Sequence, residues 1–254
     1  MSNSVELDVS ARGVATITLN RPERSNALDQ ATLDELAEQF AARAADDRTR
    51  VVVLRGRGRH FCAGADLVAR AAGAESAPAR TSIVDMLAAL DRLPKPTIAA
   101  VHGAAIGGGA AIAACCDVVL AADSAFFSVP EVRIGMPPLG VAPFLVRAMG
   151  HRSLRRYGLS GERFGAAEAL RIGLVHEVVS AAKLDEKLGE IADALLHGAP
   201  QAQRAVKAGL EHSVTPSVAD ILAHGASHGS PRSAEALEGI ASFKEKRKPS
   251  WYPQ

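Results

Sequence analysis

Three short segments of this chain carry the residues that could do chemistry. They are Phe61-Cys-Ala-Gly-Ala65-Asp-Leu67, His102-Gly-Ala-Ala-Ile-Gly-Gly108-Gly-Ala-Ala111 and Val129-Pro-Glu131-Val-Arg-Ile-Gly135. Glycine and alanine keep bulky side chains away from the backbone, so a ligand oxygen can approach a main-chain N–H closely. Two such loops that face each other would offer two N–H donors to a developing oxyanion, and Glu131 would supply an acid or a base.

Each segment also has a plainer interpretation. The glycines of an isolated triplet, Gly107-Gly108-Gly109, also serve close packing of a helix on a strand. Glu131 follows a proline and would then be an ordinary surface carboxylate. Cys62 could be a nucleophile, but only His60 lies near it in sequence, and a reactive thiolate needs an electropositive setting. The functional interpretation therefore depends on the elements that hold these segments.

Those elements alternate between strand and helix. Val5–Val9 and Val14–Leu19 alternate apolar and polar residues around a turn at 11–13, which predicts a hairpin. Asp29 is a suitable N-cap for a helix whose apolar residues recur at helical spacing. Further strands are predicted at 51–54, 97–101 and 117–120, with a glycine-rich loop at 56–64, a helix marked by Ile83, Leu87 and Leu90, and a helix entry at the glycine triplet. This order predicts an α/β fold with a mainly parallel sheet.

From about Ala142 onward the pattern is almost entirely helical. Glycines at 150, 161, 165 and 173 separate short helices, and Ser230-Pro231 is typical of a helix start. We therefore predict one α/β core over residues 1–197 and a helical C-terminal part over residues 198–254.

Composition excludes several function classes. The chain has 254 residues, 29 Lys plus Arg and 28 Asp plus Glu, so its formal charge is +1. A charge so near zero gives no electrostatic basis for binding nucleic acid or an anionic membrane surface. The apolar stretch 104–122 contains Asp117 and a glycine triplet, and we interpret it as a buried segment of a soluble protein. Three cysteines, two of them adjacent, form no disulfide framework and favour a reducing compartment. The first eight residues show no secretion signal, so we predict a cytoplasmic protein.

Common cofactor and nucleophile motifs nearly match but fail. A phosphate-binding loop would need lysine at Gly109, and a dinucleotide fingerprint would need glycine at Phe61. The segment 158–161 is one residue short of a nucleophile elbow, and His176 lacks the second histidine of a zinc helix. We therefore predict no metal and no cofactor.

Taken together, the motifs resemble the crotonase superfamily, the enoyl-CoA hydratase/isomerase family. The resemblance covers nearly the whole chain and adds five segments to the two glycine loops and Pro130-Glu131. These segments are Leu19-Asn-Arg-Pro22 with Asn26-Ala-Leu28, Gly161-Glu-Arg-Phe, Ala166-Ala-Glu-Ala-Leu-Arg-Ile-Gly-Leu174, and Phe243-Lys-Glu-Lys-Arg-Lys-Pro249.

The resemblance implies a spiral of ββα units that binds an acyl-CoA thioester, with coenzyme A as part of the substrate. It also implies a homotrimer or a dimer of trimers, with residues 198–254 as the oligomerisation region. It places the two oxyanion amides on Ala65 and Gly108, which lie 43 positions apart. Substrate binding is implied for Arg24, Ser25, Ala27, Ala63, Asp66, Leu67, Val68, Phe243 and Lys246.

The sequence departs from the two-glutamate members of this family. Glu131 matches their second glutamate, but the first would fall 20 positions earlier, on Ala111. Leu139 stands where some dienoyl isomerases and dehalogenases of the family have an aspartate. One carboxylate could orient a water for syn hydration, or it could carry a proton from C2 to C4 and move a double bond. The resemblance favours an enoyl-CoA hydratase, with a Δ3-Δ2 enoyl-CoA isomerase as the alternative.

Two other classes of function stay open at this stage. Without the first glutamate, the chain could be a non-catalytic acyl-CoA binder, and it could also be a purely structural oligomer component. Asp66 is expected to cap the helix that follows it rather than to react. The basic residues 244–248 are either a solvated face or a contact for coenzyme A phosphates.

Overall fold

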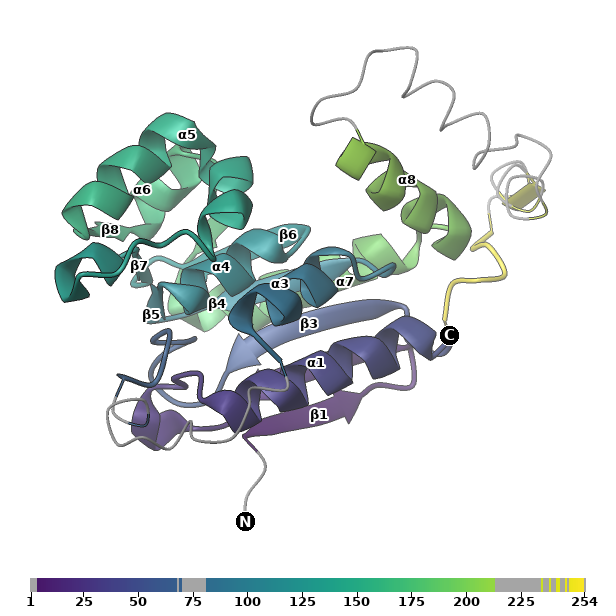
Figure 1. Ribbon diagram of the computed structural model, residues 1–254. Coiled ribbons are helices and arrows are strands. Elements are labelled where there is room, and N and C mark those ends of the chain that lie inside the picture. Colours follow the sequence, from purple (N-terminus) through teal and green to yellow (C-terminus); the bar gives the residue numbers. More distant parts are fainter. Residues whose placement is uncertain are drawn as a thin grey trace.

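The computed structural model shows a central sheet flanked by helices, with a second, small sheet beside it (Figure 1). It describes residues 4–67, 69, 81–212, 234, 238, 241, 242, 245 and 247–253. The strands are β1 (Val5–Val9), β2 (Val14–Leu19), β3 (Val51–Gly56), β4 (Thr97–Val101), β5 (Ala104–Ile106), β6 (Val118–Ala122), β7 (Phe126–Ser128), β8 (Arg163–Gly165) and β9 (Glu177–Val179). The helices are α1 (Gln30–Ala45), α3 (Ile83–Asp91), α4 (Gly108–Cys115), α5 (Ala142–Ser160), α6 (Ala166–Arg171), α7 (Leu184–Leu196) and α8 (Pro200–His212), and the 3-10 turns are η1 (Pro22–Arg24), η2 (Glu131–Ile134) and η3 (Ala181–Lys183).

The large sheet has the strand order β1-β2-β3-β4-β6-β9. The hairpin is antiparallel, with Val5 opposite Leu19, and every other pair is parallel. The run Val51–Leu54 is buried along its whole length, as expected for a strand covered on both faces. The hairpin and the mainly parallel sheet predicted from the sequence are therefore confirmed.

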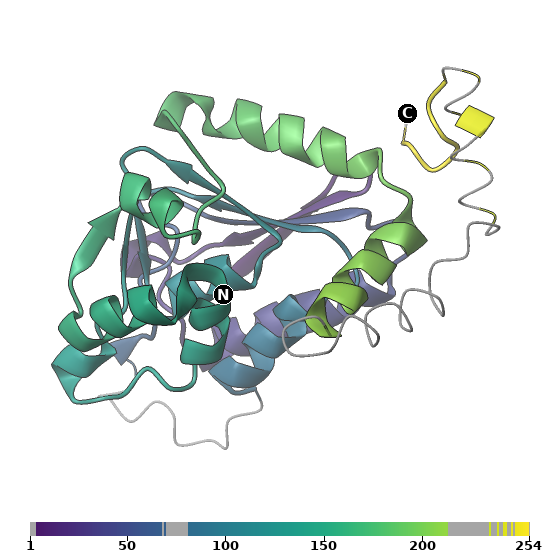
Figure 2. The same ribbon diagram turned by 90° about the horizontal axis from the view of Figure 1, so that it is seen from above.

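Helices cover both faces of this sheet (Figure 2). One face packs against α7, and their shared apolar cluster includes Val53, Ile98 and Leu196. The other face packs against α1, α3 and α4, which contact one another in that order. Asp29 caps α1 by accepting a hydrogen bond from the Thr32 N–H at 2.9 Å, as the sequence predicts.

The small sheet has the order β5-β7-β8, and its first strand, β5, follows β4 of the large sheet along the chain. Strands β5 and β7 are parallel, with Ile106 opposite Ser128. Phe127 and Tyr157 each stack on Phe164, with ring centroids 5.8 and 4.0 Å apart. These aromatic contacts fasten helix α5 to the small sheet.

The prediction of an almost wholly helical chain after Ala142 is wrong at two places. Strand β8 joins the small sheet, and β9 becomes the edge of the large one by pairing with β6. Each has three residues, too few to show a period-2 pattern. The predicted helix start at Ser230 lies outside the described residues, but Ala234, Glu238, Ala241, Ser242 and Glu245 beyond it are helical.

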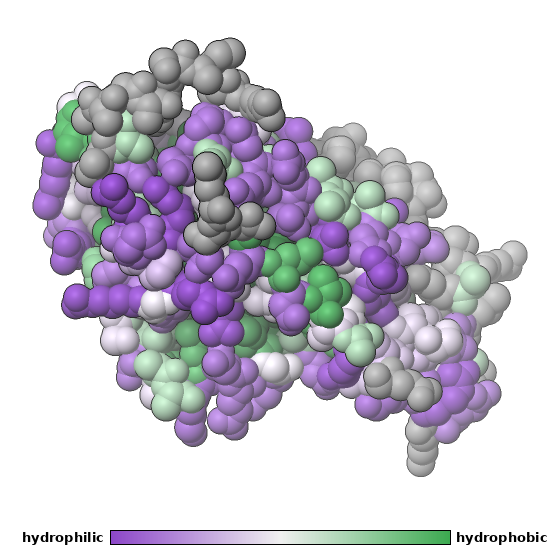
Figure 3. All heavy atoms as spheres, turned by 90° about the horizontal axis from the view of Figure 1, so that it is seen from below, coloured by the Kyte–Doolittle hydropathy of each residue, from purple (hydrophilic) through white to green (hydrophobic). Residues whose placement is uncertain are grey.

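Within the described ranges, no helix is both long and apolar enough to cross a membrane. The face drawn in Figure 3 is mainly hydrophilic, with a small group of apolar side chains near its middle.

Candidate active site

Parallel strand pairing brings the candidate segments to one edge of the structure. The carboxyl ends of parallel strands meet at the same edge, and here β5 ends beside β7. The Gly107 N–H donates to the Ser128 carbonyl at 2.9 Å, which ties the second glycine loop to the segment that leads to Glu131. Cys62 forms a parallel bridge with Ala105, so the first glycine loop emerges at the same place.

The direction of the Ala65 N–H is set by a hydrogen bond that the carbonyl of the preceding residue, Gly64, accepts. The Leu28 N–H donates to the Gly64 carbonyl at 2.7 Å, and the Asp66 N–H donates to the Leu28 carbonyl at 2.9 Å. Because a trans peptide is planar, its C=O and N–H point in opposite directions. The Ala65 N–H therefore points away from Leu28, and it has no backbone acceptor among the described residues.

The Gly108 amide is aimed in the same way by helix α4. The Ala111 N–H donates to the Gly107 carbonyl at 3.0 Å, so the Gly108 N–H of the same peptide points out of the helix N-terminus. This N–H also has no backbone acceptor in the described part of the chain. A Cβ placed on Gly64 would lie 3.6 Å from the Gly108 nitrogen and 2.7 Å from the Ile106 oxygen. The two glycine loops are therefore in contact.

Glu131 lies beside the second loop. A Cβ placed on Gly107 would lie only 2.4 Å from Glu131 Oε1, so the carboxylate rests against the glycine backbone. Glu131 Oε2 is buried and has no hydrogen-bond partner among the described residues. Burial raises the pKa of Glu131 above its ordinary value, because the charged form loses hydration. This carboxyl group therefore keeps its proton to a higher pH than an exposed glutamate does, which suits an acid or base.

The surroundings of Gly108 are aliphatic. A Cβ there would meet the Leu28 Cδ1 at 3.1 Å and the Ile83 Cδ1 at 3.5 Å. A Cβ placed on Gly140 would likewise lie 3.4 Å from the Val84 Cγ2. The contacts of Gly108 put apolar side chains from α3 and from the segment before α1 next to this candidate amide, and Val84 brings α3 against the loop before α5.

Several residues predicted to bind substrate surround the first loop. The Ala63 N–H donates to the Ser25 carbonyl at 3.0 Å, which joins the loop before α1 to the first glycine loop. Arg24 and Leu67 are exposed and Ala27 is buried. Val68, Phe243 and Lys246 lie outside the described residues.

Asp66 has a structural role as a helix cap, as predicted. Its Oδ1 accepts a hydrogen bond from the Ala69 N–H at 3.0 Å, and its Oδ2 lies 3.0 Å from Nη2 of Arg21. Asn26 has a second such task, since its Nδ2 donates to the carbonyls of Arg57 and His60. Sequence reasoning assigned no role to Arg21 or Asn26, although both lie in the segments that carry the family resemblance.

Cys62 is not arranged as a nucleophile. Its side chain is fully buried, and burial raises its pKa to about 12. Nδ1 of His60 accepts a hydrogen bond from the Ala104 N–H at 3.1 Å. Both observations favour Glu131 as the acid or base of this site.

Comparison with known proteins decides the family. The sequence profile of the enoyl-CoA hydratase/isomerase family matches residues 10–254. The chain belongs to the enoyl-CoA hydratase/isomerase family. A carnitinyl-CoA dehydratase of Proteus mirabilis is 36% identical over 258 residues, which cover 98% of each chain.

Solved structures of family members share this fold. An enoyl-CoA hydratase of Mycobacterium smegmatis superposes with a TM-score of 0.90 at 32% identity, over 98% of this chain and 99% of that one. The protein AtuE of Pseudomonas aeruginosa gives a TM-score of 0.92 at 36% identity over the same shares. The crotonase-like fold expected from the sequence is thereby confirmed.

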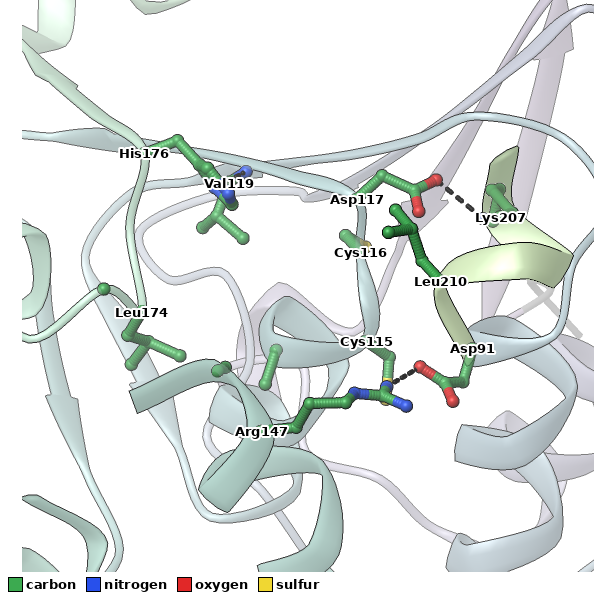
Figure 4. Close-up of a pocket in the computed structure, with 13 residues that line it drawn as sticks. Asp91, Cys115, Cys116, Asp117, Val119, Arg147, Leu174, His176, Lys207 and Leu210 are labelled. Carbon is green, nitrogen blue, oxygen red and sulfur yellow. Dashed lines mark hydrogen bonds and ion pairs between the residues drawn. The ribbon is translucent and has the colours of Figure 1, made fainter. Parts of the chain in front are cut away.

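This family member also has a pocket of about 320 Å³ that Glu131 does not line (Figure 4). Two ion pairs border it, Asp91 with Arg147 and Asp117 with Lys207, the second at 2.6 Å. Asp117 also accepts hydrogen bonds from the N–H and hydroxyl of Thr97, at 2.8 and 2.9 Å. The charged groups therefore link α3 to α5 and β4 to α8 around the pocket.

Proposed function

We propose that this protein is an enoyl-CoA hydratase that acts on a 2-enoyl-CoA thioester. The amides of Ala65 and Gly108 would bind the thioester oxygen, and Glu131 would be the single acid/base. The observation that carries this proposal is the convergence of the three groups. Gly64 touches the second loop beside the Gly108 nitrogen, and the Glu131 carboxylate lies against Gly107.

Two amides on one thioester oxygen make C3 of the substrate electrophilic. Glu131 orients a water molecule and takes one of its protons while the water oxygen bonds to C3. The electrons of the double bond move toward the thioester and form an enolate, whose oxygen the two amides stabilise. Glu131 then returns the proton to C2, which completes the addition of water. Loss of one such donor costs about 2.7–4 kcal/mol of transition-state stabilisation.

The type of reaction, addition or removal of water, has support from a relative. The Proteus mirabilis relative is named as a dehydratase of a CoA thioester. Dehydration and hydration are one reaction in two directions, and the same groups serve both. This favours water addition or removal over other reactions of an enolate.

Double-bond migration is the second candidate, because the first glutamate is absent. Ala111 is fully buried and, three residues after Gly108 on α4, carries only a methyl group. A lone Glu131 can take a proton from C2 and return it to C4 without a water. A Δ3-Δ2 enoyl-CoA isomerase is therefore the alternative activity.

The remaining assignments follow from the family. We propose that Arg24, Ser25, Ala27, Ala63, Asp66, Leu67, Val68, Phe243 and Lys246 hold the coenzyme A moiety of the substrate. We also propose a cytoplasmic homotrimer or dimer of trimers without a metal or cofactor. Light scattering of the full chain tests the assembly, and a monomer would contradict it.

The activity test uses two substrates and one variant. Crotonyl-CoA should gain one water in a mass measurement, whereas 3-hexenoyl-CoA should keep its mass and gain conjugated-thioester absorbance if isomerisation occurs. Glu131→Gln should lose about 10²–10⁴-fold in rate. Glu190→Gln is the matched control, because Glu190 is exposed on α7 and pairs with Lys187. Binding of both thioesters without turnover would contradict catalysis.

A further inference from the structure

Arg21 joins the two segments whose contact aims the Ala65 amide. Its Nη2 lies 3.0 Å from Oδ2 of Asp29 and 3.0 Å from Oδ2 of Asp66. Its Nη1 donates to the Ala27 carbonyl. The guanidinium thus binds the segment Ala27–Asp29 on one side and the first glycine loop on the other.

The segment that Arg21 grips includes the residue that orients the peptide. Leu28 lies between Ala27 and Asp29, and its N–H donates to the Gly64 carbonyl. That hydrogen bond turns the Gly64–Ala65 peptide so that the Ala65 N–H faces the site. A shift of Leu28 relative to the loop would rotate this peptide and misdirect the N–H.

The ion pair between the two segments is shielded from water. The Arg21 and Asp66 side chains are only 16% and 6% exposed, so water competes weakly for the contact. Without the guanidinium, the carboxylates of Asp29 and Asp66 would lose the cationic group that contacts both of them. Their repulsion would act directly on the contact between Leu28 and Gly64.

We propose that Arg21 is a positioning residue of this enzyme, which acts through Asp29 and Asp66 to hold the Ala65 N–H toward the thioester oxygen. The inference rests on the proposed function, because it assigns Arg21 a part in the oxyanion site. Arg21 itself touches no reacting atom. Its removal should lower kcat by about 10- to 100-fold, since small misplacements at a reaction centre have effects of that size. KM should change much less.

The test measures polarisation of a bound carbonyl rather than stability. A conjugated thioester absorbs at longer wavelength when its oxygen accepts strong hydrogen bonds. The probe is 2,4-hexadienoyl-CoA at saturation, bound to full-length Glu131→Gln so that no turnover occurs. The absorption maximum is compared with and without Arg21→Met, with Arg21→Lys as the conservative variant. Arg48→Met is the control, because the Arg48 side chain is 88% exposed and pairs with Asp46 rather than with Asp29 or Asp66.

The inference predicts a red shift in Glu131→Gln that Arg21→Met removes, Arg21→Lys partly restores and Arg48→Met leaves unchanged. An unchanged absorption maximum in Arg21→Met, at whatever affinity, overturns the inference and leaves the proposed function standing. No red shift in Glu131→Gln itself contradicts the proposed function instead. If Arg21→Met does not fold, Asp66→Asn decides in its place, because the amide keeps an acceptor for the Ala69 N–H and loses the charge that Arg21 binds.

Discussion

The carboxylate of Glu131 rests on the backbone of Gly107, where a Cβ would lie 2.4 Å from Oε1. Gly107 also has φ 53° and ψ −112°, a conformation that residues with a side chain rarely adopt. One glycine therefore turns the chain into helix α4 and leaves room for the acid beside the Gly108 amide.

Replacement of this glycine should damage activity and stability together. Gly107→Ala should lower the free energy of unfolding by about 1–3 kcal/mol, because of the strained backbone. It should also lower kcat by at least about tenfold, because the new methyl group displaces the carboxylate. Urea unfolding and steady-state rates measure both effects.

The control for this variant is Gly189→Ala. Gly189 lies in α7, and a Cβ there would have no heavy atom within 4 Å. Gly189→Ala should stabilise the protein by about 0.5–1 kcal/mol and leave kcat unchanged. Full activity in Gly107→Ala would show that Glu131 does not need its present position.

Glu131→Gln should be more stable than the parent protein at neutral pH. Burial raises the folded-state pKa of Glu131, so the folded protein holds its proton to higher pH than the unfolded chain does. Ionisation of Glu131 therefore costs stability as pH rises, and glutamine removes that cost. The melting-temperature difference should be largest near pH 8. It should vanish only well below about pH 4, where the carboxyl group is protonated in the folded and the unfolded chain alike.

A melting-temperature difference of the opposite sign at about pH 8 would contradict this account. It would mean that the ionised carboxylate is stabilised in the fold by more than its unpartnered Oε2 indicates.

Thiol reagents should leave the native enzyme active. All three cysteines are buried, and burial raises the pKa of each thiol, that of Cys62 to about 12. Iodoacetamide at about pH 8 should therefore add no mass to the native protein and should modify all three thiols after denaturation. Rapid inactivation with one adduct on Cys62 would revive the nucleophile interpretation.

Asp117→Ala should weaken the fold without altering the chemistry. The N–H and hydroxyl of fully buried Thr97 would lose their acceptor, at a cost of about 1–3 kcal/mol. Asp185→Ala removes an ion pair whose carboxylate is 72% exposed and should cost less than about 1 kcal/mol. Urea unfolding measures the loss of stability in both variants. Equal losses would contradict the expectation that the more buried carboxylate contributes more.

Local patterns predicted most of the framework. The hairpin, the buried run at Val51–Leu54 and the Asp29 cap each depend on residues that are close in sequence, so their signals are direct. The family resemblance then placed Ala65, Gly108 and Glu131 together, and the fold brings their segments into contact.

Contacts between distant short segments escaped prediction. Strands β5 and β7 have three residues each, yet their pairing sets Glu131 beside Gly107. Strand β9 was missed for the same reason, because three residues carry no recognisable period. The ion pair between Arg21 and Asp66 spans 45 positions and depends on how two loops pack, which no local pattern records.

A crystal structure of Glu131→Gln with crotonyl-CoA tests the central claim most directly. The account predicts the thioester oxygen within about 3.2 Å of the backbone nitrogens of both Ala65 and Gly108, with the residue 131 side chain over the C2–C3 bond. A thioester oxygen bound elsewhere, or either N–H donating to a protein carbonyl, would contradict it.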